Sequence, residues 1–257
     1  MRTWRRAVVT LLAGLIWPAA ALAQVQPDPA GFSNWAVGIV AADWRDSEGG
    51  TIEAFENAKT ALTKGFESVG FRAENITSLS LRPNQTNGWA LASEVAFASI
   101  ASKAAAASSG CLLYFTSHGS PEGIVLGREG VLGPGRMNSL VTEWCGERPT
   151  VVVVSACYSG VFVPALAGPN RLVMTAARPD RSSFGCEADF EYTVFDGCVL
   201  QSLPEADDFV DLSSRTRRCV AGLERRLRLT PSEPQSFVGA DVEDLFIFQN
   251  FSRPPPE

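Results

Sequence analysis

The sequence predicts an α/β protein with a doubly wound, mostly parallel sheet of about six strands and helices on both faces. Short apolar runs alternate along the chain with segments of helical length, the order expected of right-handed βαβ units. The runs are continuous rather than alternating, and Thr150 to Ala156 contains four consecutive valines. Continuous apolar runs are typical of strands that are buried on both faces of a parallel sheet.

Each element follows from its own local pattern. The predicted strands cover Trp35 to Ala42, Ile76 to Leu81, Cys111 to Thr116, Thr150 to Ala156 and Arg171 to Ala176. The predicted helices, which have apolar residues at helical spacing or lack Gly and Pro, cover Thr51 to Val69, Trp89 to Ala107, Met137 to Cys145, Tyr192 to Leu203 and Ser213 to Leu227. No strand is assigned to the glycine-rich stretch from Gly119 to Gly135. A last strand is expected within Phe237 to Phe248.

Composition excludes several classes of function. The 257 residues carry a formal net charge of −6, which argues against a general nucleic-acid binder, because such a protein needs a basic face. The single histidine, His118, excludes a histidine-rich metal site, and no metal or cofactor is expected. Any imidazole chemistry must therefore use His118.

The N-terminus has the three parts of a secretory signal peptide. Arg2, Arg5 and Arg6 precede an apolar run, and small residues before residue 24 fit cleavage after Ala23. An N-terminal membrane anchor is the alternative, although the run is short for a membrane span. We expect residues 1–23 to be removed on export to a periplasm or the cell exterior. Residues 24–257 then form a single domain without stable membrane insertion and with a proline-rich tail from about residue 253.

Chemistry-bearing residues follow two of the predicted strands. His118 comes two residues after the strand that ends at Thr116, and Cys157 comes directly after the valine run. Ligands of open α/β sheets bind outside the carboxyl ends of the strands. If the two strands are neighbours, a thiol and an imidazole meet one substrate there, and together they are suited to nucleophilic catalysis.

Glycine after the histidine fits the same chemistry. An anionic tetrahedral intermediate needs backbone N–H donors, and Gly119 lets the chain approach a substrate carbonyl closely. The N–H of Cys157 supplies a second donor in this hypothesis. A buried structural cysteine and a surface histidine are the plain alternatives for the two residues taken singly.

Three sequence blocks resemble legumain-type cysteine peptidases, the asparaginyl endopeptidases. They are Tyr114 to Ser120, Ser155 to Gly160, and Thr175 to Pro179 followed by Ser182 and Ser183. The resemblance covers the chain loosely from Trp35 to about Gly239. It implies the caspase-like fold, a Cys–His dyad, cleavage of protein or peptide substrates after Asn or Asp, and a short secreted form of bacterial type.

The resemblance also implies roles for residues outside the dyad. Asp43 takes the place of an Asn that orients the histidine in the family, and Arg45 would line the primary specificity pocket. Ser183 matches a pocket serine, and Asp196, or alternatively Asp189, is the candidate pocket acid. A charged turn exposed to solvent is the plain alternative for Asp43 and Arg45.

The remaining cysteines suggest two disulfides. With Cys157 kept as a nucleophile, five cysteines remain, so at most four pair within the chain. Cys198 and Cys219 lie on successive predicted helices, and Cys111 and Cys145 lie at element ends that flank the histidine segment. These pairings are hypotheses, since sequence does not determine connectivity.

Two alternatives to hydrolysis stay open at this point. An amine could resolve the thioester in place of water, which would make the protein a transamidase. The same fold could also serve as a catalytically silent binding module. A serine hydrolase lacks support, because the chain contains no G-x-S-x-G motif. The sequence does not indicate an oligomeric state.

Overall fold

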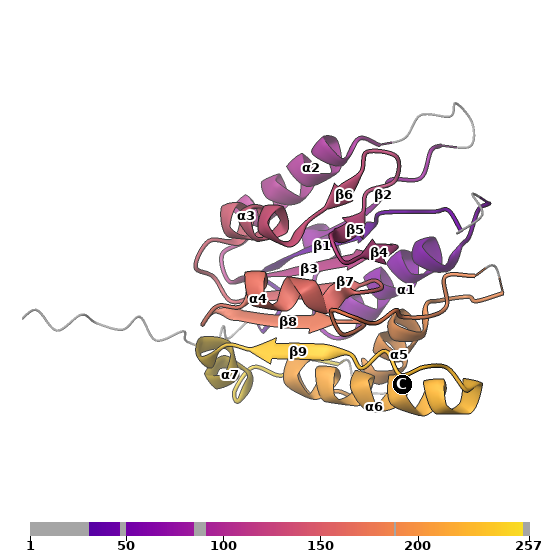
Figure 1. The fold of residues 1–257 in the computed structure, drawn as a ribbon. Coiled ribbons are helices and arrows are strands. Elements are labelled where there is room, and N and C mark those ends of the chain that lie inside the picture. Colours follow the sequence, from indigo (N-terminus) through magenta and orange to yellow (C-terminus); the bar gives the residue numbers. More distant parts are fainter. Residues whose placement is uncertain (1–30, 47–49, 85–90, 188, 254–257) are drawn as a thin grey trace, which may run out of the picture.

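A six-stranded sheet forms the centre of the molecule (Figure 1). The computed structural model describes residues 31–46, 50–84, 91–187 and 189–253, so the predicted signal peptide lies outside the described residues. In spatial order the strands are β2 (Ile76–Ser80), β1 (Trp35–Ala41), β3 (Gly110–Thr116), β7 (Thr150–Ser155), β8 (Arg171–Thr175) and β9 (Gln235–Val238). The first five are parallel, and β9 pairs antiparallel with β8. The predicted mostly parallel sheet is confirmed.

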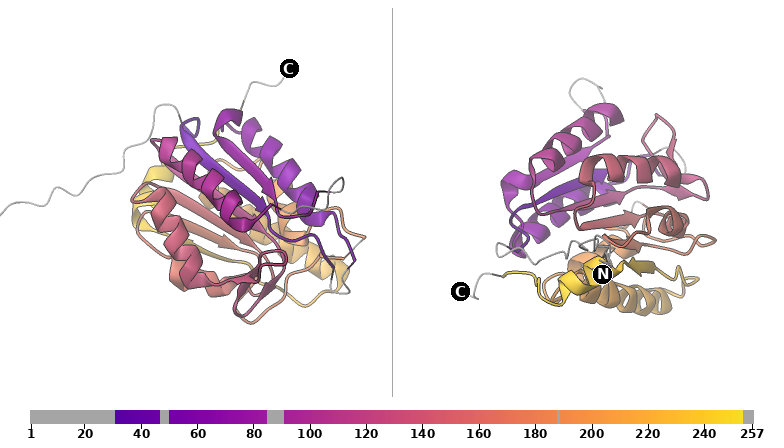
Figure 2. Two further views of the ribbon diagram at one scale, coloured as in Figure 1. Left: turned by 90° about the horizontal axis from the view of Figure 1, so that it is seen from above. Right: turned by 90° about the vertical axis from the view of Figure 1, so that its left-hand side faces the viewer.

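Helices cover both faces of the sheet, as the turned views in Figure 2 show. One face carries α1 (Ala54–Ser68), α5 (Val194–Ser202), α6 (Phe209–Leu227) and α7 (Ala240–Phe246). The other carries α2 (Ser93–Ala106), α3 (Pro134–Cys145) and α4 (Val163–Leu166), while the single 3-10 turns η1 (Ala73–Asn75) and η2 (Ser159–Phe162) lie in connections. No helix among the described residues is long and apolar enough to cross a membrane.

The central strands are apolar throughout because both of their faces are buried. Tyr114 and Val153 belong to the core beneath α1, α5 and α6, whereas their neighbours Leu113 and Val152 belong to the core beneath α2 and α3. Side chains alternate between the two faces of a strand, so each core receives every second residue. Full burial of one such aliphatic side chain contributes about 1.5–3 kcal/mol.

Two expectations about the chain outside the main sheet are corrected. The last strand is Gln235–Val238, and most of the stretch expected to contain it forms α7. Val242, Leu245 and Phe246 are buried at helical spacing, which explains the helix. The glycine-rich stretch forms a small antiparallel sheet of β4 (Gly119–Ser120), β5 (Gly123–Val125) and β6 (Val131–Leu132).

Both proposed disulfides are present. Cys111 at the start of β3 is bonded to Cys145 at the end of α3, and Cys198 of α5 is bonded to Cys219 of α6. Cys157 and Cys186 are free thiols. On each face of the sheet, one disulfide therefore ties a helix covalently to a neighbouring element.

The Cys198–Cys219 disulfide gives a first prediction, for stability. It joins residues separated by 21 positions, and we expect the double variant Cys198→Ala/Cys219→Ala to lose about 2–4 kcal/mol of unfolding free energy. The loss arises because the unfolded chain gains conformational freedom. Urea denaturation of the oxidised proteins measures it. Cys111→Ala/Cys145→Ala opens a longer loop of 34 positions and should cost at least as much, whereas unchanged urea midpoints would contradict the expectation.

Candidate active site

His118 and Cys157 leave adjacent parallel strands at the same edge of the sheet. β3 pairs directly with β7, and Thr116 lies opposite Ser155 in the register. Each functional residue follows two positions later, and the N–H of Ser117 donates to the carbonyl of Ser155 at 3.1 Å. The adjacency expected from the sequence is thus observed, and both side chains are partly exposed.

Gly119 packs directly against the segment that carries Cys157. A Cβ atom at position 119 would overlap the carbonyl oxygen of Cys157 and lie 3.0 Å from the Cβ of Ala156. Only glycine permits this approach, which sets the main chain after His118 against the main chain of Cys157. The two N–H groups proposed as oxyanion donors therefore belong to neighbouring backbone segments.

The thiol of Cys157 contacts the backbone of Ser183. The Ser183 N–H donates to Sγ at 3.3 Å, the Ser183 carbonyl oxygen lies at 3.4 Å, and the Ser183 hydroxyl lies at 3.8 Å. Tyr158, the next residue, has a φ of 58°, an uncommon backbone conformation for a residue other than glycine. Its N–H donates to the carbonyl of Arg181 at 2.7 Å. The loop after β8 therefore holds the turn that carries Cys157 in place.

A backbone carbonyl orients His118. The Nε2 atom lies 2.5 Å from the carbonyl oxygen of Arg45, and Phe55 meets the imidazole edge-on with ring centroids 5.1 Å apart. A carbonyl accepts hydrogen bonds only, so this contact assigns the proton of the neutral imidazole to Nε2. Nδ1 is then left with the lone pair that can accept a proton.

Asp43 acts on the turn that carries this carbonyl and makes no direct hydrogen bond to His118 among the described contacts. Its carboxylate is 3% exposed and accepts from the N–H groups of Trp44 and Arg45 at 2.8 Å and 3.3 Å. The Arg45 guanidinium adds two more hydrogen bonds, at 2.9 Å from Nε and 3.1 Å from Nη2. The contacts link Asp43 to His118 indirectly, because Asp43 binds the turn and Arg45 supplies the carbonyl acceptor.

Arg45 is held from several sides. Besides Asp43, its guanidinium donates to the carbonyl of Gly127 and lies 5.3 Å from the ring centre of Trp44. The hydrogen bond to Asp43 raises the pKa of Arg45. Its side chain remains 32% exposed although its charge is paired with Asp43.

Asp196 lies beneath the dyad and is fully buried. Its carboxylate accepts hydrogen bonds from the hydroxyls of Tyr114 and Thr116, each at 2.6 Å. The Ser155 and Thr193 hydroxyls also stabilise its charged form, and Thr193 caps α5 by accepting from the Asp196 N–H at 3.0 Å. Burial nevertheless raises the pKa of Asp196. The Asp196 carboxylate thus joins β3, β7 and α5, whereas Asp189, the alternative pocket acid, is exposed.

Cys186 is a second free thiol near the site. It is partly exposed and packs against the small cluster of Ala41, Ile52 and Phe55, the last of which also contacts His118. Burial raises the pKa of Cys186 well above its ordinary value, and the negative charges of Cys157 and Glu187 add to the effect.

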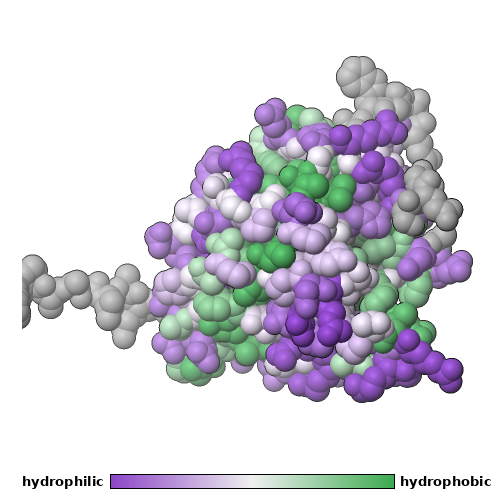
Figure 3. Space-filling view, viewed as in Figure 1, coloured by the Kyte–Doolittle hydropathy of each residue, from purple (hydrophilic) through white to green (hydrophobic). Residues whose placement is uncertain are grey.

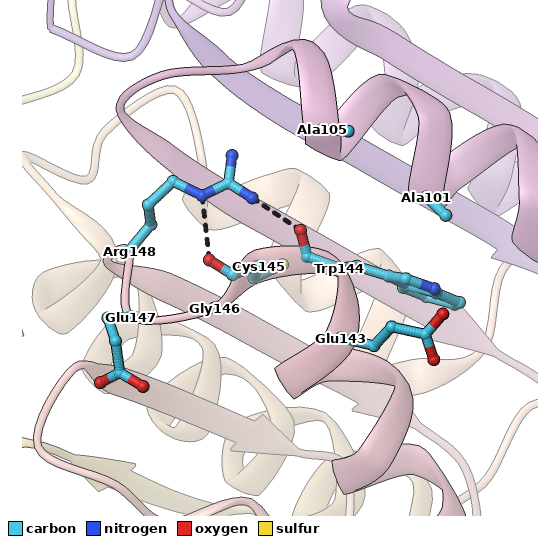
Figure 4. A pocket seen from close by; sticks show the side chains of 8 residues that line it. All are labelled: Ala101, Ala105, Glu143, Trp144, Cys145, Gly146, Glu147 and Arg148. Atoms are coloured by element: carbon cyan, nitrogen blue, oxygen red, sulfur yellow. Dashed lines mark hydrogen bonds between the residues drawn. The ribbon is translucent and has the colours of Figure 1, made fainter.

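A surface pocket lies at the opposite edge of the sheet. It has a volume of about 660 Å³ and includes Trp144, Cys145 and Arg148 (Figure 4). Arg148 donates to carbonyls at the ends of two helices, among them Trp144 and Ala104, so it caps α2 and α3. Because Arg148 precedes β7, this pocket is remote from Cys157. In the described part of the chain, no three histidine, cysteine or carboxylate side chains are grouped so as to hold a metal ion.

The site and a family match indicate a cysteine peptidase, and a structural comparison shows that the fold is caspase-like. Residues 102–217 match the sequence model of the Peptidase C13 family, a span that contains His118 and Cys157 but excludes Asp43 and Arg45. The crystal structure of caspase-1 from Spodoptera frugiperda superimposes with a TM-score of 0.61 over 87% of this chain and 93% of that chain. At 14% identity that likeness shows the fold. No curated protein sequence matches the chain significantly.

Asp196 gives a prediction for the pH dependence of stability. Its pKa is raised in the folded protein, so the stability contributed by the protonated carboxyl is present at low pH and is lost as pH rises through the raised pKa. We expect wild type to lose unfolding free energy relative to Asp196→Asn as pH rises from about 4. Urea titrations of both proteins between pH 4 and 8 measure the difference. Parallel stability curves would show that the carboxyl titrates normally.

Cys186 gives a prediction for thiol reactivity. Because its pKa is raised well above the ordinary value, little thiolate forms near neutral pH, and only the thiolate is alkylated rapidly. In the Cys157→Ala variant, iodoacetamide should modify Cys186 more slowly at pH 8 than it modifies a model peptide thiol. Peptide mapping by mass spectrometry follows the reaction. An equal or faster rate would contradict the structure of this loop.

Proposed function

We propose that the protein is an exported cysteine endopeptidase that cleaves peptide bonds after Asn and Asp. The observation that carries the proposal is the placement of His118 and Cys157 after the paired strands β3 and β7, with Gly119 packed against Cys157. Nucleophile, base and oxyanion donors are thereby gathered at one edge of the sheet.

The reaction follows from the imidazole tautomer. Sγ of Cys157 attacks the substrate carbonyl carbon, and its proton passes to Nδ1 of His118, while Nε2 stays bound to the Arg45 carbonyl. The N–H groups of Gly119 and Cys157 stabilise the oxyanion. When the C–N bond breaks, His118 returns the proton to the departing amine and a thioester remains. Water then attacks the thioester with His118 as base, and an acid product and the free thiol are released.

Specificity is assigned to Arg45. Nε and Nη2 of its guanidinium are bound to Asp43, and among the described contacts Nη1 has no acceptor. An Asn or Asp side-chain oxygen can accept from Nη1. Because Asp43 already neutralises the charge of Arg45, the neutral Asn side chain should be preferred over an ionised Asp. Ser183, whose backbone touches the Cys157 thiol, contributes to the wall of the same pocket.

Export is supported by the two disulfides of the described structure. Structural disulfides persist in oxidising compartments such as a periplasm or the extracellular space and are rare in a cytosol. This agrees with the signal peptide proposed for residues 1–23.

Reporter peptides that share all residues except Asn, Asp, Gln or Ala before the cleaved bond test the proposal. We expect cleavage in the order Asn, Asp, then the others, and a loss of at least about 10³-fold in Cys157→Ala and His118→Ala, as for other nucleophile and base removals. Cys186→Ala is the matched control and should keep activity. Equal rates in wild type and Cys157→Ala would overturn the proposal, and a ligated product on addition of a peptide amine would identify a transamidase instead.

A further inference from the structure

Basic charge is concentrated in one helix of an otherwise acidic protein. The chain carries a net charge of −6, and removal of the signal peptide with its three arginines would make it −9. Between Leu212 and Ser232, however, six arginines accompany a single acidic residue, Glu224. Most of this stretch is α6.

The arginines face solvent and are mostly unpaired. Arg215 pairs with Asp211 and Glu205. In the described part of the chain the other side chains form no ion pair or hydrogen bond, although Arg218 attracts the Asp211 carboxylate at longer range. All five are exposed: Arg217, Arg218, Arg225, Arg226 and Arg228. The single acidic residue does not offset them at the surface, because Glu224 is 3% exposed and accepts from the Ser232 N–H at 3.0 Å. We call these five side chains the α6 arginine face.

The carboxyl end of this face lies at the edge of the sheet that carries Cys157. Pro231, just beyond α6, accepts from Nη1 of Arg181 at 3.1 Å, and Ser232 accepts from the Arg178 N–H at 2.9 Å. The Arg181 carbonyl in turn binds the N–H of Tyr158, the residue after the nucleophile. A short chain of direct contacts therefore connects the active-site turn with the end of α6. Hydrophilic side chains gather along the lower border of Figure 3, where α6 lies in the matching view of Figure 1.

A shallow groove continues from this end along the helix. It has a volume of about 480 Å³ and is lined by Arg217 and Arg218 on one side and by Glu233, Pro234 and Gln235 on the other. The Glu233 carboxylate is paired with Arg178 and Arg181, so its charge is offset there. Gln235 begins β9, opposite Thr175 at the carboxyl end of β8. The groove therefore provides a path for an extended chain away from the site edge.

We propose that the α6 arginine face is a docking site for an acidic segment of the polypeptide substrate, outside the residues that flank the cleaved bond. The inference rests on the proposed peptidase function, because it is the substrate chain that reaches from Cys157 to α6. Exposed arginines without partners attract carboxylates, raise the rate of encounter and repel cationic chains. Since the rest of the surface is predominantly acidic, an acidic segment is steered to α6 in particular.

Matched peptides test the proposal. Each contains the same short neutral cleavage sequence, extended at one end or the other by six glutamates or by six glutamines. We expect kcat/KM for the glutamate peptide to exceed that of the glutamine peptide by about tenfold for one of the two placements, mainly through KM. The preference should fall as salt rises, because the charges are exposed.

Charge-reversal variants locate the effect. Arg225→Glu/Arg226→Glu should abolish the preference while cleaving the unextended neutral peptide as wild type does, and the milder Arg225→Gln/Arg226→Gln should reduce it. The control variant Lys64→Glu/Arg72→Glu changes the net charge by the same amount. Lys64 lies on α1, Arg72 follows that helix, and both are exposed, so this variant should keep the preference. A preference absent from wild type, or lost equally in both reversal variants, would overturn the proposal.

A binding measurement separates this proposal from the proposed function. Fluorescence anisotropy of a labelled hexaglutamate peptide with Cys157→Ala needs no catalysis, so failure to cleave the neutral peptide affects only the peptidase proposal. Binding that Arg225→Glu/Arg226→Glu removes would support the docking site. No binding, or stronger binding to vesicles of anionic phospholipid or to single-stranded DNA than to hexaglutamate, would contradict it.

Discussion

A buried carboxylate without a cation is the constraint on which the site depends. Removing an isolated carboxylate from water is costly unless several donors replace the lost water. Asp196 meets this condition only when the hydroxyls of Tyr114 and Thr116 on β3, of Ser155 on β7, and of Thr193 before α5 converge on it. That convergence sets the relative position of two strand ends and one helix. His118 and Cys157 follow those strand ends by two residues each, so the hydroxyl network lies next to the segments that carry them.

Main-chain atoms complete the positioning of the dyad. The Arg45 carbonyl binds the imidazole, the Ser183 N–H reaches the thiol, and the backbone of Gly119 packs against that of Cys157. Side chains contribute indirectly, by holding these main-chain atoms in position: the Asp43 carboxylate fixes the turn that presents the carbonyl of Arg45. A substitution at Asp43 would therefore reach the dyad through backbone geometry rather than through loss of a charge next to the imidazole.

The difference between side-chain patterns and main-chain contacts explains how much of the fold and site the sequence could predict. The central strands were predictable because a strand buried on both faces needs a continuous apolar run, and the dyad was predictable because its residues follow two such runs. The contacts of Ser183 and Arg45 were not, since backbone donors and acceptors exist at every position and only folding selects them. The burial of Asp196 depends on four hydroxyls that are distant in sequence. The last strand was misplaced because β9 is short and only half-buried, so it carries a weak apolar signal beside the stronger pattern of α7.

The Cys198–Cys219 disulfide links α5, the helix that carries Asp196, to the arginine-rich helix α6. Cys198 lies two residues after Asp196 on α5, and its disulfide to Cys219 fastens α5 to α6 directly after Arg217 and Arg218. The α6 helix also packs through Phe209 and Val220 into the core that contains Tyr114, whose hydroxyl binds Asp196. A segment bound on α6 would thus rest on a helix that is joined to the site through this disulfide and the shared core. Docking there would contribute affinity through the local concentration of the cleavable bond and would leave the chemistry at Cys157 unchanged.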